Sequence, residues 1–523
     1  MTSAKNQYDV VVVGGGHNGL VSAAYLARAG LSVLVLERLD HTGGAAVSAT
    51  AFAGRQARLS RYSYLVSLLP TRLVDDLGLD IALASRSTSS YTPVLRDGKP
   101  GGLLVERPEG EATRRSFEGL TGGPTEYDAW RKFYADTADL AQVVAPTLLS
   151  PLPVERSIRD QVDAGTWRDF VERPLGEAIE ARFTDDTVRG VVATDALIGT
   201  FASLRDESLV QNRCFLYHLI GNGTGEWRVP IGGMGAVTDA LAKAAVSAGA
   251  EVITSAGVSA VRASGDGAEV TWDDGGSNRT VGARFVLSNV APWVLRILLG
   301  EPEDPATKPV GAQLKINFLL DRLPRLRSGV DPSVAFAGTL HLDEDYSQLE
   351  AAYAEAASGS VPSVLPGEVY CHSLTDPSIL GESPEGTHTL TYFGLHTPAT
   401  LFDADPVGAK ALAVSRALAS IDSHLVEPLE TCLARDGAGN PCIEAKIPQD
   451  IEADLAMPGG HIFHGDLDWP WAPNRARLET PAQRWGVQTD VPSVLICGAG
   501  ARRGGAVSGI GGHNAAQAVL ESL

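Results

Sequence analysis

The chain has 523 residues, and 43 Lys plus Arg stand against 63 Asp plus Glu, which gives a formal net charge of −20. This length predicts two or more domains with a large buried core. The negative charge disfavours nucleic acid as a partner, because nucleic-acid binding depends on cations that neutralise phosphates. The N-terminal sequence MTSAKNQYD has no apolar signal core, and no apolar stretch approaches the roughly 20 residues that span a bilayer, so we expect a cytoplasmic protein.

The cysteines and the missing catalytic motifs exclude several enzyme classes. No two cysteines have the C-x-x-C spacing, which disfavours a disulfide-shuttling reductase and a structural zinc site. The chain has no G-x-S-x-G and no H-E-x-x-H, so neither a hydrolase nor a metalloprotease is expected. The five cysteines are Cys214, Cys371, Cys432, Cys442 and Cys497.

A glycine-rich stretch follows the first apolar run of the chain. Four valines at 10–13 favour a strand, and residues 20–30 have the composition of a helix that ends near Gly30. Gly14, Gly16 and Gly19 lie between them in G-x-G-x-x-G order. In such a turn the glycines allow a tight bend, admit a pyrophosphate against the backbone and let the helix pack on the strand.

A second apolar strand at 31–37 ends on Glu37, about twenty residues after the glycines, where an acidic residue binds a ribose hydroxyl. Gly43 and Gly44 follow shortly afterwards. We therefore predict a dinucleotide site rather than an unoccupied βαβ unit.

Two later segments repeat the alternation of strand and helix. Residues 226–295 contain a glycine-led helix and four strands, but their glycines do not complete a second G-x-G-x-x-G, so we expect no separate NAD(P) site. Residues 491–523 read as a strand, a loop with seven glycines between Gly498 and Gly512, and a helix. Such a loop indicates a backbone that closely approaches a ligand.

These blocks predict an α/β fold with a discontinuous nucleotide-binding domain. Its segments are 1–75, 226–295 and 451–523, and the substrate domain is formed by the insertions 76–225 and 296–450. The two terminal blocks must meet if the last glycine loop is to complete the cofactor site.

Several motifs resemble those of known flavoproteins. GGGHNGLVSAAYLARAGLSVLVLERLDHTGGAA is similar to the flavin-binding start of phytoene-desaturase-like and amine-oxidase-like flavoproteins. RLSRYSYLVSLLP, GGMGAVTDALA, FVLSNVAP, LKINFLLDRLP, GTLH, PGGHIFHGDL and CGAGARRGGAVSGIGGHNAA resemble, in the same order, the pyridine nucleotide-disulfide oxidoreductase domain-containing protein 2 family. The resemblance implies a Rossmann-type FAD-binding domain with an inserted mixed-sheet and helical substrate domain. It also implies non-covalent FAD and hydride transfer from a hydrophobic, polyene-like or lipid-like molecule to the flavin.

The same resemblance implies roles for individual residues. Gly14, Gly16 and Gly19 would hold the pyrophosphate, Glu37 and its neighbour Arg38 would lie at the adenosine ribose, and Gly43, Gly44 and Ala45 would line the loop toward the ribityl chain. Val258 would meet the adenine, Gly500 the ribityl–phosphate region, and Ser508, Gly509 and Ile510 the pyrimidine edge of the flavin.

One loop departs from the family pattern. Arg502 and Arg503 stand where relatives often have His-Pro. If either side chain points inward, its positive charge would favour the reduced, anionic flavin and raise the flavin potential. Alternatively, both point to solvent or bind the FAD pyrophosphate.

His464 is our candidate for a proton acceptor, because a histidine titrates near neutrality, although a hydrogen-bonded structural histidine is the more frequent case. We expect no metal at His461, His464 and Asp466, since no further ligand accompanies them. Arg55, Arg58 and Arg61 either meet an anionic group or form a solvated face.

Three alternatives remain open. The stretch RYSYLVSLLP is expected to pack in the core, but it would also suit an apolar tunnel or contact with a membrane surface. An amine-oxidising flavoenzyme is the second functional hypothesis, and it needs an aromatic cage or an acidic group facing the flavin. A flavin-stabilised interaction protein with little turnover is the third. The sequence does not indicate an oligomeric state.

Overall fold

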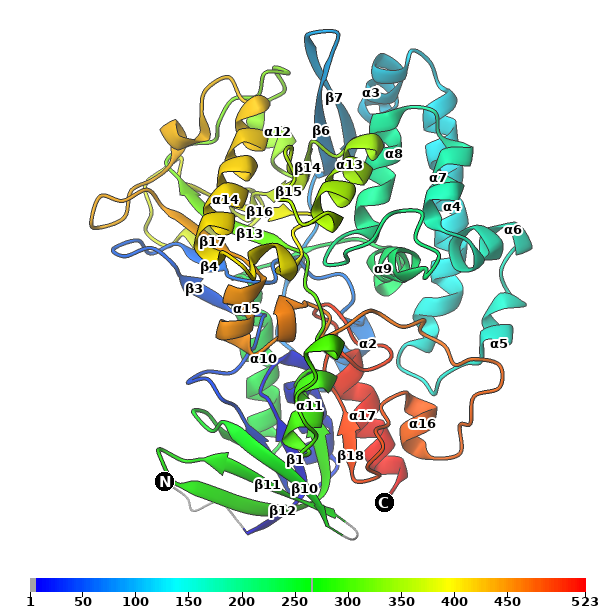
Figure 1. The fold of residues 1–523 in the computed structure, drawn as a ribbon, viewed down its shortest axis with the longest axis vertical. Helices are drawn as coiled ribbons and strands as arrows, with labels where there is room; N and C mark the ends of the chain where they lie inside the picture. The colour runs from blue at the N-terminus through cyan, green and yellow to red at the C-terminus, as the bar shows by residue number, and fades with distance from the viewer. Residues whose placement is uncertain (1–5, 265–266) are drawn as a thin grey trace.

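The computed structural model describes residues 6–264 and 267–523, so the segment MTSAK lies outside the described residues. Two seven-stranded sheets lie at opposite ends of its long axis (Figure 1). The first sheet has the order β10 (Val258–Ser264), β11 (Gly267–Asp273), β12 (Asn278–Ser288), β1 (Gln7–Val13), β2 (Val33–Leu36) and β9 (Glu251–Ile253), and β18 (Val494–Ile496) pairs with β12.

The predicted valine strand forms the centre of this first sheet. β1 pairs in parallel with β12 on one side and with β2 on the other. Val10, Val11 and Val12 are fully buried, as is usual for a parallel strand that is covered on both faces. β-branched side chains suit this environment because they pack well on a pleated surface.

Three helices cover this sheet beside the glycine-rich segments. They are α1 (His17–Arg28), α10 (Met234–Ser247) and α17 (Ile510–Glu521), and α1 packs against both of the others. The end of the chain therefore lies beside its beginning, as the sequence predicted. Gly30 adopts a φ of 89° just after α1, which fits its predicted place at the helix end.

The second sheet is mostly antiparallel. Its order is β17 (Ile443–Lys446), β13 (Leu314–Leu320), β16 (His388–Gly394), β15 (Gly367–Tyr370), β14 (Thr339–Leu342), β6 (Thr88–Arg96) and β7 (Lys99–Glu106). Only β14 and β6 run parallel to each other among these pairs. Ile316 and Phe318 of β13 pack in one core with Ala417 of α14 (Pro406–Ser423), which covers this sheet.

A helical region stands beside the second sheet at the upper right of Figure 1. It contains α3 (Glu111–Thr121), α4 (Thr125–Val144), α5 (Glu155–Arg159), α6 (Ala164–Trp167), α7 (Leu175–Arg182), α8 (Asp186–Ala193) and α9 (Val210–Leu219). Phe133, Phe183 and Phe215 fill its centre and are buried.

The remaining strands and α-helices connect or flank these parts. They are β3 (Ser48–Thr50) with β4 (Arg58–Ser60), β5 (Leu83–Ala84) with β8 (Val229–Pro230), α2 (Thr71–Leu77), α11 (Pro292–Leu298), α12 (Pro332–Ala335), α13 (Tyr346–Ala357), α15 (Pro448–Leu455) and α16 (Pro481–Trp485). Within the described part of the chain, no helix has both the length and the apolar character needed to cross a membrane.

The two large sheets draw their strands from different parts of the chain. Every strand of the first sheet comes from the segments 1–75, 226–295 or 451–523, and every strand of the second comes from 76–225 or 296–450. The exact domain boundaries remain a prediction.

Candidate functional site

A cavity of about 680 Å³ has walls from both sheets. Gly14, Gly16 and Glu37 line it from the first sheet, and Lys315 and Glu368 line it from the second. Its position at the carboxyl end of β1 is where α/β folds bind nucleotides. We therefore describe this cavity from the glycine turn outward.

The glycine turn has the close packing that its motif predicts. Gly14 has a φ of +99°, a conformation that favours glycine. A Cβ atom on Gly19 would lie 2.3 Å from the carbonyl oxygen of Gly14, so only glycine lets α1 start this close to β1. The side-chain amide of Asn289 donates a hydrogen bond of 3.1 Å to the same carbonyl and ties the turn to the end of β12.

Glu37 is buried beside this turn and lines the cavity. Its Oε2 accepts a 2.7 Å hydrogen bond from the backbone N–H of Gly15, and its Oε1 accepts one of 2.8 Å from Leu39. Each carboxylate oxygen has a second lone pair, so these bonds hold Glu37 in place and leave acceptor capacity for a ribose hydroxyl. A glycine turn with this acidic neighbour fits the adenosine diphosphate part of a flavin dinucleotide.

Other residues predicted for the cofactor also border the cavity. Arg38, Gly44, Ala45 and Val258 line it, and Arg38 donates a 2.7 Å hydrogen bond to the carbonyl of Asp454. Gly43 and Gly19 do not line it, but Gly43 forms a β-bridge with Gly16 and Gly19 packs against the carbonyl of Gly14. The roles of these residues toward FAD remain predictions.

The C-terminal glycine loop borders the cavity through residues beside the predicted ones. Ala499, Ala506 and Val507 line it, next to the predicted Gly500 and Ser508. Gly509 caps the start of α17, which begins at Ile510. Ser508 and Ile510 are fully buried at this helix end.

The two arginines of this loop do not face the cavity, which corrects the hypothesis that either points toward the flavin. Arg503 is 1% exposed, and its guanidinium donates to the carbonyls of Thr147, Ser150 and Trp485. Arg502 donates to the carbonyl of Trp471 and pairs with Asp468 at 3.1 Å. Both arginines therefore link chain segments to each other, and neither places its positive charge beside a ligand in the cavity.

His464 lines the cavity, as a proton acceptor must. It has a φ of 65°, which is rare for a non-glycine residue and recurs at functional sites. Its Nδ1 is buried without a hydrogen-bond partner among the described residues. Burial, followed by the nearby His461 and His17, lowers the pKa of His464 to about 3, so the ring is neutral near pH 7.

His17, at the start of α1, is a second cavity histidine that the sequence analysis did not select. Its Nε2 is also buried without a partner among the described residues, and burial lowers its pKa to about 4. Both histidines therefore have unused hydrogen-bonding capacity beside the cavity.

His461 has a structural role. Its Nδ1 accepts hydrogen bonds from the backbone N–H groups of Phe463 and Gly465, and its Nε2 lies 3.8 Å from Asp466. His464 joins this arrangement only through its backbone N–H, which donates a 3.0 Å hydrogen bond to the carbonyl of His461.

The stretch RYSYLVSLLP serves both the core and the cavity. Val66, Leu68 and Leu69 are buried in the core, as expected, whereas Tyr64 and Leu65 line the cavity.

The three arginines of this region do not line the cavity. Arg61 pairs with Glu444 at 2.6 Å, Arg55 donates to the carbonyl of Arg435, and Arg58 is exposed.

Lys315 of β13 is a cavity residue that sequence reasoning missed. Its Nζ donates to the carbonyls of Ser60 and Tyr62 and lies 4.8 Å from the ring centre of Tyr64. Burial lowers the pKa of this amine well below its ordinary value. The alternation of the strand LKINFLL gave the only signal, because it places one charged residue among buried apolar ones.

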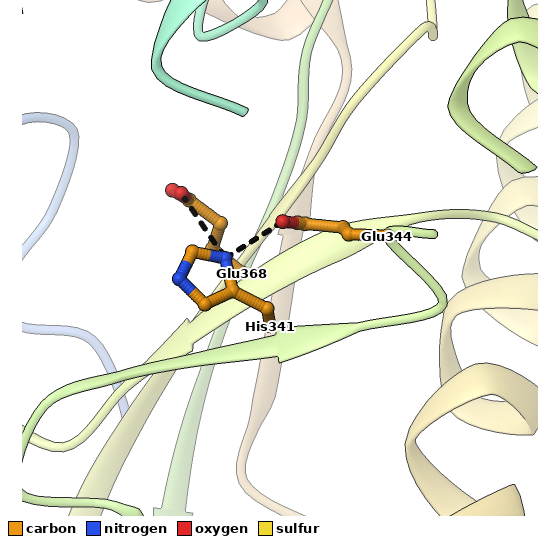
Figure 2. Close-up of side chains that lie close together, drawn as sticks. All are labelled: His341, Glu344 and Glu368. Carbon is orange, nitrogen blue, oxygen red and sulfur yellow. Dashed lines mark hydrogen bonds and ion pairs between the residues drawn. The ribbon is translucent and has the colours of Figure 1, made fainter. Parts of the chain in front are cut away.

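A buried polar cluster, His341, Glu344 and Glu368, was also missed; Figure 2 shows its imidazole between two carboxylates. The Nδ1 atom of His341 lies 2.7 Å from Oε2 of Glu344 and 3.9 Å from Oε1 of Glu368. Burial, followed by the charge of Glu344, raises the pKa of Glu368 to about 8. Although burial lowers the pKa of His341, the two carboxylates raise it above its ordinary value. The cluster comes from three positions up to 27 residues apart that no local motif connects.

Comparison with models of known protein families identifies the family of this chain. The model of the flavin containing amine oxidoreductase family matches residues 72–363, more than half of the chain. The chain belongs to this family. The preceding residues 12–72 match an NAD(P)-binding Rossmann-like domain, in agreement with the glycine turn.

Relatives over the full length extend this result. An uncharacterized protein of Mycobacterium tuberculosis is 51% identical over 100% of this chain and 99% of its own length. The mouse pyridine nucleotide-disulfide oxidoreductase domain-containing protein 2 is 30% identical over 99% of this chain and 94% of its own, which confirms the predicted resemblance. The prolycopene isomerase of carrot is 24% identical over 83% of this chain and 69% of its own.

A solved structure of putrescine oxidase shares the fold. It has a TM-score of 0.59 and 18% identity and covers 99% of both chains. Family membership and this fold confirm the prediction of an FAD-dependent oxidoreductase with a Rossmann-type domain. As a member of this flavin oxidoreductase family, the protein is an enzyme.

Proposed function

We propose that this flavin oxidoreductase acts on a hydrophobic, polyene-like or lipid-like small molecule, as a desaturase, oxidase or isomerase. The observation that carries the proposal is the apolar wall of the cavity beyond the glycine turn. The apolar and aromatic residues of this wall are Tyr64, Leu65, Val105, Trp130, Tyr134, Val191, Ile198, Leu219, Trp227, Phe393, Ile462 and Phe463. The name of the carrot relative, prolycopene isomerase, points to the same chemical class.

The apolar wall contributes to catalysis by excluding water. A hydrophobic molecule that fills this space displaces solvent, and charges beside it then interact more strongly than they would in water. The glycine turn and Glu37 hold the dinucleotide, and the bound FAD supplies the hydride acceptor. The protein must then provide a group that receives the proton.

We assign the role of proton acceptor, for the proton that leaves the substrate carbon, to Nδ1 of His464. His464 lines the cavity, and its Nδ1 is buried without a hydrogen-bond partner among the described residues, so this atom has unused capacity to accept a proton. The lowered pKa keeps the ring neutral before the reaction, as a base requires, but it makes the histidine a weak base. The proton is therefore held only briefly and passes on to solvent or another cavity group.

Amine oxidation is the second candidate function. Glu368 and Asp195 both line the cavity and provide the acidic group that recognition of an ammonium ion requires. The family name and the putrescine oxidase fold agree with this candidate. However, Tyr64 and Tyr370 have ring centres only 4.7 Å apart, which leaves no room for an amine between these two rings.

Anaerobic stopped-flow spectroscopy tests the proposal. We expect detergent-dispersed polyenes to bleach the visible flavin absorbance of the FAD-loaded protein, or the chemically reduced protein to interconvert their geometric isomers, as seen by chromatography. Putrescine and benzylamine serve as the matched amine probes. Bleaching by amines alone would overturn the polyene proposal, and no turnover of either class would overturn both candidate substrate classes.

A further inference from the structure

The buried cluster of His341, Glu344 and Glu368 has no role in the function proposed above. We propose that these three residues bind one divalent transition-metal ion, of the class of Zn²⁺ or Mn²⁺, in the wall of the cavity. This site is independent of the substrate class, and it differs from the sequence-based expectation that the chain binds no metal.

The strand register brings the ligands together. In the antiparallel pair β14–β15, His341 lies directly opposite Glu368, so their side chains project from the same face as neighbours. Asp343 follows β14 with a φ of 52°, and this turn returns Glu344 to the imidazole (Figure 2). One donor atom of each of the three residues lies within 4.8 Å of the others. Donors bound to one zinc ion at about 2.0–2.2 Å lie at most about 4.4 Å apart, so small side-chain rotations suffice.

An oxygen atom without a partner marks the cluster as a ligand site. Glu344 is 0% exposed, and its Oε1 has no hydrogen-bond partner among the described residues. A buried carboxylate oxygen without a partner is costly. Since Oε2 of the same carboxylate already lies against His341, an ion beside the imidazole would be in reach of Oε1 as well.

The surroundings of the cluster are acidic. Glu344, Glu368 and Asp195 interact electrostatically with one another or with His341, and Arg86 faces Glu368 and Asp195. A bound cation would be attracted to these carboxylates and would replace the protons that they and His341 hold, because metal ligands bind in their deprotonated form.

The donors and their neighbours favour a transition metal. One imidazole nitrogen and two carboxylates suit Zn²⁺ or Mn²⁺, whereas Mg²⁺ prefers oxygen ligands. The hydroxyls of Tyr370 and Thr194 donate to Glu368, which orients this carboxylate as the outer partners of metal ligands usually do.

The position of Glu344 is fixed by backbone packing. A Cβ on Gly190 of α8 would lie 1.7 Å from the carbonyl oxygen of Glu344, so this helix holds the turn after β14 at van der Waals distance. Because His341 and Glu368 line the cavity, open coordination positions would face the substrate.

Equilibrium dialysis against buffered Zn²⁺ tests the site. FAD-loaded protein is first freed of metal with a chelator, and zinc and flavin per chain are then measured separately by elemental analysis and absorbance. We expect one zinc per chain in the wild type. His341→Asn, Glu344→Gln and Glu368→Gln should each weaken zinc binding at least tenfold.

Glu109→Gln is the matched control, because Glu109 is another carboxylate of the cavity wall that lies outside the cluster. It should bind zinc as the wild type does. If a variant does not fold, X-ray absorption of the wild-type zinc protein still tests the site, since it must show one nitrogen and two carboxylate ligands. Equal zinc uptake by the wild type and Glu344→Gln, or a different ligand set, would overturn the proposal. Because flavin is counted separately, a protein that binds zinc but no FAD would contradict only the proposed function.

Discussion

The two walls of the cavity are built in different ways. The cofactor wall is formed by a turn within one short segment, where Gly14, Gly16 and Glu37 lie near each other in the sequence. The opposite wall is assembled by strand register, which places His341 against Glu368 across β14 and β15. The cofactor wall starts from a turn of small residues, whereas the opposite wall carries a cluster of ionisable side chains on neighbouring strands. The first kind of site can be read from a motif, and the second only from a fold.

The largest effect is expected from a substitution that disrupts FAD binding at the cofactor wall. A Cβ on Gly16 would lie 2.9 Å from Nδ2 of Asn289, and a larger side chain there would also occupy the space of the pyrophosphate. We expect Gly16→Leu to weaken FAD binding more than 100-fold, about 2.7 kcal/mol, while the fold persists. Flavin absorbance after reconstitution and circular dichroism measure the two effects. Gly119→Ala, at a helical glycine with open space around it, should bind FAD normally.

The next largest effect distinguishes the roles of His464 and His17, the two histidines of the cofactor wall. His464→Asn keeps a residue that tolerates positive φ but cannot accept the proton. We expect flavin reduction by the substrate that the stopped-flow test identifies to slow about 100-fold, within the usual range for loss of a general base, with FAD content unchanged. His17→Gln is the matched variant and should slow the reaction less. An unchanged rate in His464→Asn would show that another group takes the proton.

In chelator-treated protein, His464 of the cofactor wall and Glu368 of the opposite wall should change the free energy of unfolding with pH in opposite directions. The pKa of His464 falls from 6.5 to about 3 on folding, so below pH 6.5 the unfolded chain binds the extra proton and acid destabilises the fold. The pKa of Glu368 rises from 4.5 to about 8, so between these values the folded state holds the proton and rising pH destabilises it. Each slope should approach about 1.4 kcal/mol per pH unit.

Urea unfolding at several pH values measures these slopes. Relative to the wild type, His464→Asn should gain stability as the pH falls from 6.5, and Glu368→Gln should gain stability as the pH rises from 4.5 toward 8. Parallel curves for the wild type and either variant would contradict the corresponding assignment.

The smallest effect is expected from a substitution in the C-terminal glycine loop. Because Arg502 points to the carbonyl of Trp471 and to Asp468, Arg502→Gln should leave the flavin midpoint potential unchanged. It should cost about 1 kcal/mol of stability or less, as expected for a partly exposed pair. Spectroelectrochemistry checks the potential, and a lower value in the variant would restore the idea of an inward charge.

Sequence reasoning went furthest where function is local. The strands and helices around the glycine turn, the meeting of the chain ends and the flavoprotein class all followed from short motifs in order. The orientation of Arg503 was not predictable, because its partners Thr147 and Ser150 lie about 350 residues away in the sequence. The cluster at His341 was not predicted from the sequence for the same reason, because it depends on which strands pair with each other and in what register.

The bond between Asn289 and Gly14 has a consequence for biosynthesis. Its two residues are 275 positions apart, and Asn289 follows β12, the direct neighbour of β1. At about 5–20 residues per second, translation reaches Asn289 roughly 14–55 s after Gly14. During that interval one edge of the valine strand lacks its partner and is open to aggregation or to a chaperone. We therefore expect the glycine turn to reach its final geometry only after Asn289 has been made, past the middle of the chain.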